Sequence, residues 1–170
     1  ASGECVPAEV VVSNACAAWT YGRLLPPGAR RRWTTRRIER SRYSMGLFVW
    51  YFGTRRRYPG VAHHTLVLGP RYEGLLRDVF DRKRLAGDCS LYLHRPTATD
   101  PSLAPPGCDA FYVLSPVPHL GGGTDWTQAA EPYRAMVARR LEETVLPGFE
   151  GTIVTSRVTT PLDFRDDFLS

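Results

Sequence analysis

The sequence is almost free of lysine. Of its 22 basic residues only Lys83 is a lysine, the others are arginines, and the formal net charge is +5. A basic chain favours nucleic acid or an anionic membrane surface through long-range attraction, but net charge alone does not choose between these partners. The class of partner must therefore be decided by motifs.

The chain also lacks the motifs of phosphate and dinucleotide binding. It contains no GxGxxG and no P-loop, and its one glycine run, Gly121 to Gly123, has the wrong spacing for a phosphate loop and is typical of a flexible turn. No apolar run approaches the length that crosses a bilayer, and Ala1 to Glu9 lacks the layout of a signal peptide. We therefore expect a cytoplasmic protein that binds no dinucleotide on its own.

Cysteine and histidine patterns for metals or disulfides are missing as well. The scattered cysteines contain no CxxC pair, which indicates free, mostly buried thiols: Cys5, Cys16, Cys89 and Cys108. The four histidines show no HxxxH spacing, and His63 and His64, as neighbours in a strand, should point to opposite faces. We predict no metal site. Ser90 and Ser115 lack the elbow motif of a nucleophilic serine.

The composition is that of a folded domain. The 170 residues are 43% hydrophobic and 11% aromatic, which suits one soluble domain with a core. Apolar runs predict strands at 47–52, 65–68, 90–93, 111–114 and 153–158. The order of these strands and two helices predicts an α+β fold with a mixed or antiparallel sheet flanked by helices.

The helices are predicted from apolar residues at helical spacing. One is expected over 72–80, with a single buried stripe. Asp125 is a candidate N-cap, and we expect a short first turn followed by the main helix from near Pro132 to about Val145, because proline interrupts a helix interior.

Two segments that precede the predicted strand 47–52, residues 9–15 and 30–42, also suggest a structure or a function. The β-branched run from Glu9 to Ala15 predicts a buried strand that delivers Asn14 to a strand end, where α/β proteins collect ligands. The arginine-rich stretch 30–42 predicts a surface connection. It also fits a nucleic-acid surface, although no nucleic-acid motif accompanies it, or a patch that faces a membrane.

The run from Leu47 to Phe52 is apolar at every position, which indicates a central strand covered on both faces and paired, hairpin-like, with 65–68. Its aromatic side chains Phe48, Trp50, Tyr51 and Phe52 are expected in the core. The alternative is that one face lines a cavity for a long, water-insoluble hydrocarbon, because apolar pockets gain affinity from buried area.

Several motifs, in matching order along nearly the whole chain, resemble those of bacterial phytoene desaturases. The segments that carry the resemblance are Met45–Gly53, Ala62–Thr65, Leu68–Tyr72, Leu91–Gly107, Tyr112–Leu120, Asp125–Trp126, Leu146–Gly148 and Thr160–Asp166. The resemblance implies an FAD-dependent enzyme that removes hydrogens stepwise from phytoene or a related carotenoid, toward products such as neurosporene or lycopene. It also implies peripheral association with the inner face of the cell membrane, and no nucleic acid as a partner.

The resemblance assigns the chain mainly to the substrate-binding part of such an enzyme. Residues 1–25 match a segment that returns to the FAD-binding domain, 26–165 match the substrate-binding domain of the amine-oxidase-like fold, and 166–170 match the start of a C-terminal flavin-binding segment. FAD would be bound mainly by segments absent from this chain. We therefore expect a fragment that is inactive when isolated, and the sequence leaves its oligomeric state open.

Site residues follow from the same resemblance. Asn14 and Ala15 match the strand end that approaches the flavin, and Phe48, Trp50 and Phe52 are candidates for substrate binding.

The proline-rich loop after the strand 90–93 is expected to close one wall of the site. Arg95, Pro96 and Thr99 of this loop would bind substrate, and His94 or Asp100 would assist proton transfer. The alternative, that the loop is only a structural turn, stays open.

Overall fold

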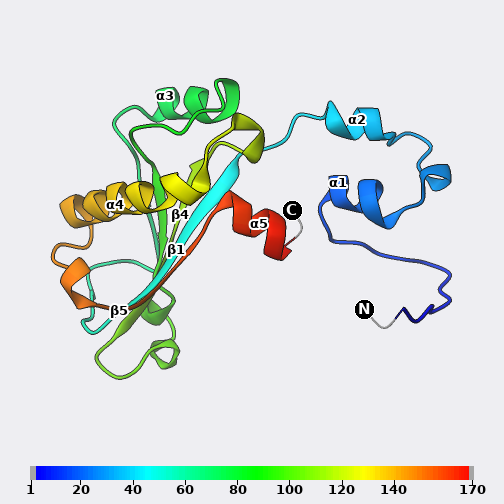
Figure 1. Ribbon diagram of the computed structural model, residues 1–170. Coiled ribbons are helices and arrows are strands. Elements are labelled where there is room, and N and C mark those ends of the chain that lie inside the picture. The colour runs from blue at the N-terminus through cyan, green and yellow to red at the C-terminus, as the bar shows by residue number, and fades with distance from the viewer. Residues whose placement is uncertain (1–2, 169–170) are drawn as a thin grey trace. The chain divides into compact units, whose positions relative to one another are not determined.

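The computed structural model, drawn in Figure 1, describes residues 3–168. Within this range the chain forms two units, one of residues 3–42 and 165–168 and the other of residues 43–164. The larger unit holds all the strands found among the described residues.

The smaller unit contains only short helical segments among its described residues. They are α1 (Ala17–Trp19), a π-helical turn (Thr20–Leu24), a 3-10 turn (Pro27–Ala29) and α2 (Thr35–Glu39). The basic stretch 30–42 is therefore largely surface, as predicted, with α2 as a short helix inside it.

The buried strand predicted over 9–15 is wrong. Residues 10–14 have no regular secondary structure, and Val10, Val11 and Val12 are 78%, 83% and 91% exposed. A strand needs neighbours for its backbone N–H and C=O groups. The described part of the smaller unit offers none, so β propensity alone does not produce a strand here.

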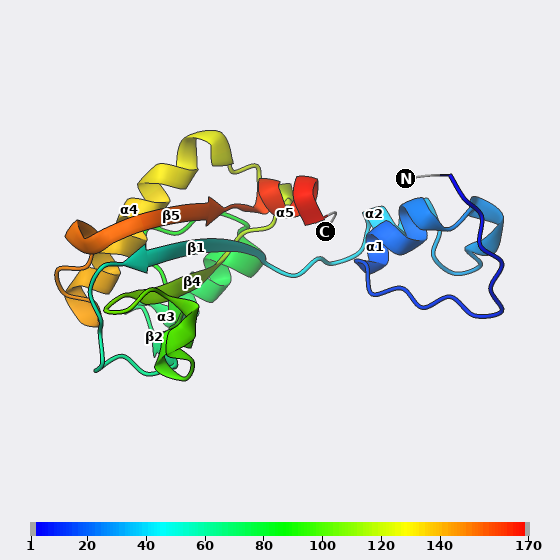
Figure 2. The ribbon, with the colours of Figure 1, turned by 90° about the horizontal axis from the view of Figure 1, so that it is seen from below.

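The larger unit is built on one antiparallel sheet of five strands in the order β2-β3-β4-β1-β5. The strands are β1 (Gly46–Thr54), β2 (His64–Val67), β3 (Leu91–His94), β4 (Asp109–Val117) and β5 (Ile153–Thr159). The predicted α+β fold with flanking helices is confirmed, and of the two predicted kinds of sheet the antiparallel one is found. Figures 1 and 2 show helix α4 (Trp126–Thr144) lying along one face of this sheet.

The predicted hairpin between β1 and β2 is wrong. β1 pairs along its whole length with β4, from Gly46 opposite Val117 to Thr54 opposite Asp109, and with β5 on its other side. β2 pairs with β3 instead. A nine-residue register of apolar partners offers β1 more cross-strand contacts than the four residues of β2 provide.

The other helices of the larger unit are shorter than α4. They are α3 (Tyr72–Leu76), continued by a π-helical turn (Arg77–Asp81), α5 (Pro161–Phe168), and 3-10 turns at Pro96–Ala98, Pro101–Leu103, Leu120–Gly122 and Glu150–Thr152. The stripe predicted for 72–80 is narrower than expected, because Leu75 and Val79 are buried whereas Tyr72 and Phe80 are about half exposed.

Helix α4 begins where the sequence predicts, because the Asp125 carboxylate accepts hydrogen bonds from Thr127 N and Oγ1 at 3.0 and 2.6 Å. The predicted break at Pro132 is wrong, since the helix continues through it. Proline removes one backbone hydrogen bond there. The buried side chains of Trp126 and Tyr133, on either side of Pro132, hold both halves of the helix against the sheet.

The core lies between α4 and one face of the sheet. Phe48 and Trp50 have no exposed surface and Phe52 has 3%. The ring of Phe48 packs edge-on to Tyr133 of α4, with 5.0 Å between centroids. Each such burial stabilises the fold by about 1.5–3 kcal/mol. The expectation that the aromatic residues of β1 form the core is therefore confirmed for Phe48, Trp50 and Phe52 and wrong for Tyr51, which is 44% exposed.

Candidate functional site: the uncovered face of the sheet

The side of β1 that points away from α4 is only partly covered. Strand alternation sends Val49 and Tyr51 to this side, where Val49 is 4% exposed and Tyr51 is 44% exposed. The prediction that β1 is covered on both faces therefore holds at Val49 and is wrong at Tyr51. An antiparallel sheet can leave one face to solvent, but such a face is normally polar.

Much of this face is aromatic or aliphatic instead, although His64, His94, Arg157 and Thr159 also lie on it. Residues directly opposite one another in neighbouring strands share a face, and the register aligns one row across all five strands: His64, His94, Tyr112, Tyr51 and Arg157. A second row lies beside it: Leu66, Tyr92, Leu114, Val49 and Thr159. We call the side chains of Tyr51, Leu66, Tyr92, Tyr112 and Leu114 the open face.

The rings of the open face contact one another. Tyr112 lies at its centre, with ring centroids 5.8 Å from Tyr51, 5.9 Å from Tyr92 and 4.6 Å from His94. Partial burial, followed by a hydrogen bond with Tyr92, raises the pKa of Tyr112 above its usual value. Leu66 is 71% exposed on the edge strand β2. Contiguous apolar surface of this kind marks a site of interaction.

A hollow of about 330 Å³ lies where β1, β4 and β5 meet the loop after β3. Tyr51, Tyr112 and Arg157 line it together with Pro96, and Phe52 also contributes. Of the predicted substrate-binding residues, Pro96 lies at this hollow, and Phe52 borders it although its side chain is only 3% exposed and belongs to the core. Phe48 and Trp50 lie under α4, and side chains without exposed surface cannot touch a ligand unless the core opens.

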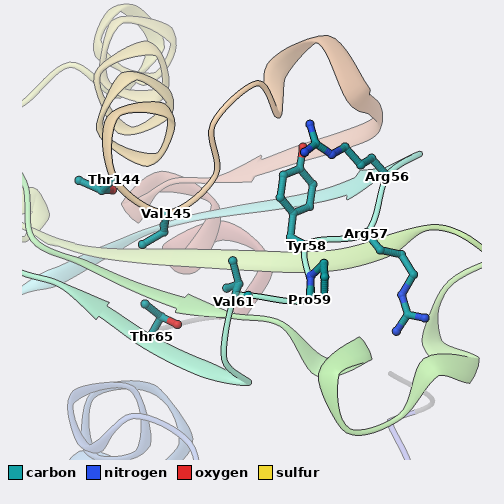
Figure 3. Close-up of a pocket in the computed structure, with 9 residues that line it drawn as sticks. Arg56, Arg57, Tyr58, Pro59, Val61, Thr65, Thr144 and Val145 are labelled. Carbon is teal, nitrogen blue, oxygen red and sulfur yellow. The ribbon is translucent and has the colours of Figure 1, made fainter.

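A second cavity, of about 390 Å³, lies beside the connection between β1 and β2 (Figure 3). The apolar part of its wall is formed by Tyr58, Val61 and Val145. The guanidinium of Arg56 lies over the ring of Tyr58, 5.1 Å from its centroid, and Arg57 Nε is 3.9 Å from the Asp109 carboxylate. Both cations therefore have partners within the chain, and they hold this connection in place.

The loop after β3 is anchored by a buried ion pair. Arg95 is 6% exposed and its Nη1 lies 3.2 Å from Asp109 Oδ2, while Asp109 has no exposed surface. Asp109 also accepts hydrogen bonds from Thr97 Oγ1 and Tyr58 N, each at 2.7 Å. The structure thus places Arg95 inside the protein, where it fixes the shape of the loop.

The other predicted residues of this loop are at its surface. Asp100 is exposed, and its carboxylate accepts hydrogen bonds from Ser102 Oγ and N at 2.6 and 3.0 Å. These bonds hold the pKa of Asp100 below its usual value, so it is ionised at neutral pH. Thr99 is hydrogen-bonded to His63, and His63 in turn contacts His94. The structure therefore brings His94 and Thr99 together.

His63 and His64 do not point apart as predicted, because their ring centroids are only 4.3 Å from each other. The reason is that β2 begins at His64, so the alternation of a strand does not extend to His63. The expectation of mostly buried thiols also fails, since only Cys89 is buried and Cys5, Cys16 and Cys108 are exposed or partly exposed.

Asn14 and Ala15, the predicted cofactor contacts, lie exposed in the smaller unit. The backbone N–H of Ala15 donates to Ser13 Oγ at 3.3 Å. Their role at a flavin stays a prediction.

The residues that sequence reasoning missed are Tyr51, Tyr92 and Tyr112. The alternation of side chains along a strand could have identified Tyr51, because it must face away from the core once Phe48 and Trp50 are assigned to the core. The cross-strand partners of Tyr51 needed the register, which the sequence does not show.

No family model matches the chain. Among curated proteins it is 52% identical over 170 residues to the neurosporene-forming phytoene desaturase of Rhodobacter capsulatus, a match that covers 97% of this chain and 32% of that protein. It is 46% identical to the lycopene-forming phytoene desaturase of Pseudescherichia vulneris, over 98% of this chain and 34% of that protein. It is 41% identical to the zeta-carotene-forming phytoene desaturase of Myxococcus xanthus, with 98% and 32% covered.

The relatives in these matches all belong to one class of proteins, the carotenoid desaturases. More particularly, the chain is a homologue of a segment of the phytoene desaturases, which confirms the resemblance found in the sequence. It spans about a third of the length of the relatives it matches.

Proposed function

We propose that the chain is part of an FAD-dependent phytoene desaturase, and that its open face forms a wall of the site for the carotenoid hydrocarbon. The observation that carries the proposal is the open face itself: an aromatic and apolar surface on the side of the sheet that α4 does not cover. The similarity to phytoene desaturases supports the same assignment.

A hydrocarbon substrate suits this surface because it offers no hydrogen-bonding groups. Its affinity must come from apolar area removed from water, at roughly 25 cal/mol per Å². Tyr51, Tyr112 and Leu114 would supply such area in one continuous strip. A long polyene exceeds the hollow of about 330 Å³, so the remaining two thirds of the enzyme would complete the cavity.

The described residues do not form a cradle for FAD. The glycine-rich turn between β4 and α4, Gly121–Gly123, lacks the GxGxxG spacing, and β4 lies in an antiparallel sheet, whereas the turn that binds a dinucleotide pyrophosphate follows a parallel strand. The cofactor would therefore be held mainly by the rest of the enzyme, with Asn14 and Ala15 as the proposed contacts from this chain.

For proton handling, His94 is the better placed of the two proposed groups. It stands in the row of Tyr112 and Tyr51, and burial followed by its histidine neighbours lowers its pKa, so it is neutral and able to accept a proton. Asp100 lies on the exposed loop and is engaged by Ser102.

Membrane association is the second part of the proposal. The exposed arginines of 30–42 suit an anionic lipid surface, which is where a hydrocarbon substrate resides, and they support the proposal that the enzyme associates with the inner face of the cell membrane. Among residues 3–168, none of the helices has the length and apolar character needed to cross a bilayer. The comparisons give the nucleic-acid alternative no support.

A chimaeric enzyme tests the proposal. This chain replaces the matching segment of the Rhodobacter capsulatus protein, and cells that make phytoene report the products by chromatography. We expect neurosporene or a related desaturated carotenoid. A chimaera that folds and binds FAD but leaves phytoene unchanged would contradict the proposed function.

A further inference from the structure

Three histidines gather at one edge of the sheet. His64 and His94 are direct cross-strand partners, and their rings are stacked with centroids 5.1 Å apart at an interplanar angle of 14°. His63, which precedes β2, lies with its ring centroid 4.6 Å from that of His94. One ring nitrogen of each histidine lies within 4.8 Å of the other two.

Hydroxyl groups orient two of these rings from outside. His63 Nδ1 is hydrogen-bonded to Thr99 Oγ1, and His64 Nδ1 to the Tyr92 hydroxyl at 2.6 Å. Ligand histidines in metal centres are held in the same manner, with the outer ring nitrogen engaged by an oxygen and the inner one turned to the ion. This leaves Nε2 of both histidines as the available ligand atom.

The inner nitrogens face one another. His63 Nε2 lies 2.7 Å from His94 Nε2, so one of these atoms donates its proton to the other. The Nδ1 atom of His94 is buried without a hydrogen-bond partner. Each neutral imidazole has one unprotonated ring nitrogen, so the three rings together can offer three lone pairs to one cation.

We propose that His63, His64 and His94 form a binding site for a divalent transition metal, with Zn²⁺ as the best fit. Three imidazoles with a fourth position open to solvent are a set that zinc accepts in tetrahedral geometry. No carboxylate or thiolate is needed, and the ion would replace the proton shared by His63 and His94.

The ligand nitrogens lie within 4.8 Å of one another and must adjust their separations to that of a tetrahedral site. Zn–N bonds of about 2.0–2.1 Å in a tetrahedron place two ligand nitrogens about 3.3 Å apart. The His63 and His94 nitrogens must therefore separate by about 0.6 Å from their present 2.7 Å, which side-chain rotation provides. With its Nε2 bound to the ion, His94 would have no lone pair left, so Zn²⁺ binding would exclude the proton transfer proposed above for this ring.

Binding would also fasten an edge of the sheet. β2 is held to the sheet only through β3, and the ion would join the start of β2 to the end of β3. Because the ion binds only the folded arrangement, the site predicts that Zn²⁺ stabilises the fold.

The test uses the untagged 170-residue chain, titrated with Zn²⁺ by calorimetry and with Co²⁺ by absorption spectroscopy. We expect one ion per chain, tetrahedral Co²⁺ bands without a thiolate charge-transfer band, and a higher melting temperature with Zn²⁺. The variants His64→Asn and His94→Asn should each weaken binding at least tenfold. His119→Asn is the matched control, because it removes the fourth histidine outside the cluster, and should bind like the parent.

Circular dichroism checks that each variant folds. His64 is exposed, so His64→Asn keeps the test valid if the His94 variant fails to fold. Absence of stoichiometric Zn²⁺ binding to the folded parent would overturn the proposal. A cobalt–thiolate band, or loss of binding in His119→Asn with retention in His64→Asn, would overturn it as well.

Discussion

The buried carboxylate of Asp109 is predicted to be one of the most sensitive positions of the fold. Replacing it with alanine removes the partner of Arg95, which is 6% exposed and would keep its charge. It also removes the acceptor for Thr97 Oγ1 and for Tyr58 N. Leaving a buried charge uncompensated costs about 3–5 kcal/mol, a large share of the 5–15 kcal/mol that typically separates folded from unfolded domains.

Urea unfolding of the 170-residue chain, followed by tryptophan fluorescence, measures this loss. The double variant Asp109→Ala/Arg95→Met should lose less stability than the two single variants together, by about 1–3 kcal/mol. Asp81→Ala serves as the control, because Asp81 is exposed, and should change stability by less than about 0.5 kcal/mol. A loss below about 1 kcal/mol for Asp109→Ala, or strict additivity, would refute the role of the ion pair.

Three further predictions concern the stability of variants in which a buried or paired side chain is replaced. Tyr133→Phe removes the 2.7 Å hydrogen bond to Ser115 and should cost about 0.5–1.5 kcal/mol in urea unfolding. The pKa of His94 is lowered in the folded chain, so the unfolded chain binds more protons. The free energy of unfolding should therefore fall as pH drops through about 6.5, and His94→Gln should reduce this pH dependence. Asp78, whose pKa three arginines depress, contributes stability that should disappear as pH falls below about 3.8, and Asp78→Asn should lose it at neutral pH.

Each of these has a contrary outcome. Unchanged stability of Tyr133→Phe would mean that the Ser115 hydroxyl finds an equal partner elsewhere. A flat pH profile between 5 and 8 would show that His94 titrates alike in both states. An acid transition identical in the parent and in Asp78→Asn would remove the arginine cluster from the stability of this segment.

Local patterns predicted most of the elements of the larger unit. The five strands, the N-cap Asp125 and the core position of Phe48 and Trp50 followed from short-range apolar spacing and capping chemistry. The spacing of apolar residues reports on interactions within one or two turns of the chain, and these interactions are enough to determine where such elements form.

Features that depend on distant residues were not predictable. The pairing of β1 with β4, and not with β2, is decided by contacts across more than fifty residues. The run 9–15 had the propensity of a strand but has no partner among the described residues. The histidine cluster arises because His63 lies just outside β2, and a shift of one residue at a strand boundary is beyond the accuracy of sequence patterns.

The role of the open face is tested most directly by an arginine scan in the chimaeric enzyme. Tyr51→Arg places a charge on the open face, and Phe80→Arg places one at a position of similar exposure outside the sheet, since the two parent side chains are 44% and 46% exposed. If the open face is the substrate wall, Tyr51→Arg should lower phytoene desaturation at least tenfold while FAD content and folding are retained, and Phe80→Arg should leave it unchanged. Equal activity of the two variants would contradict the assignment.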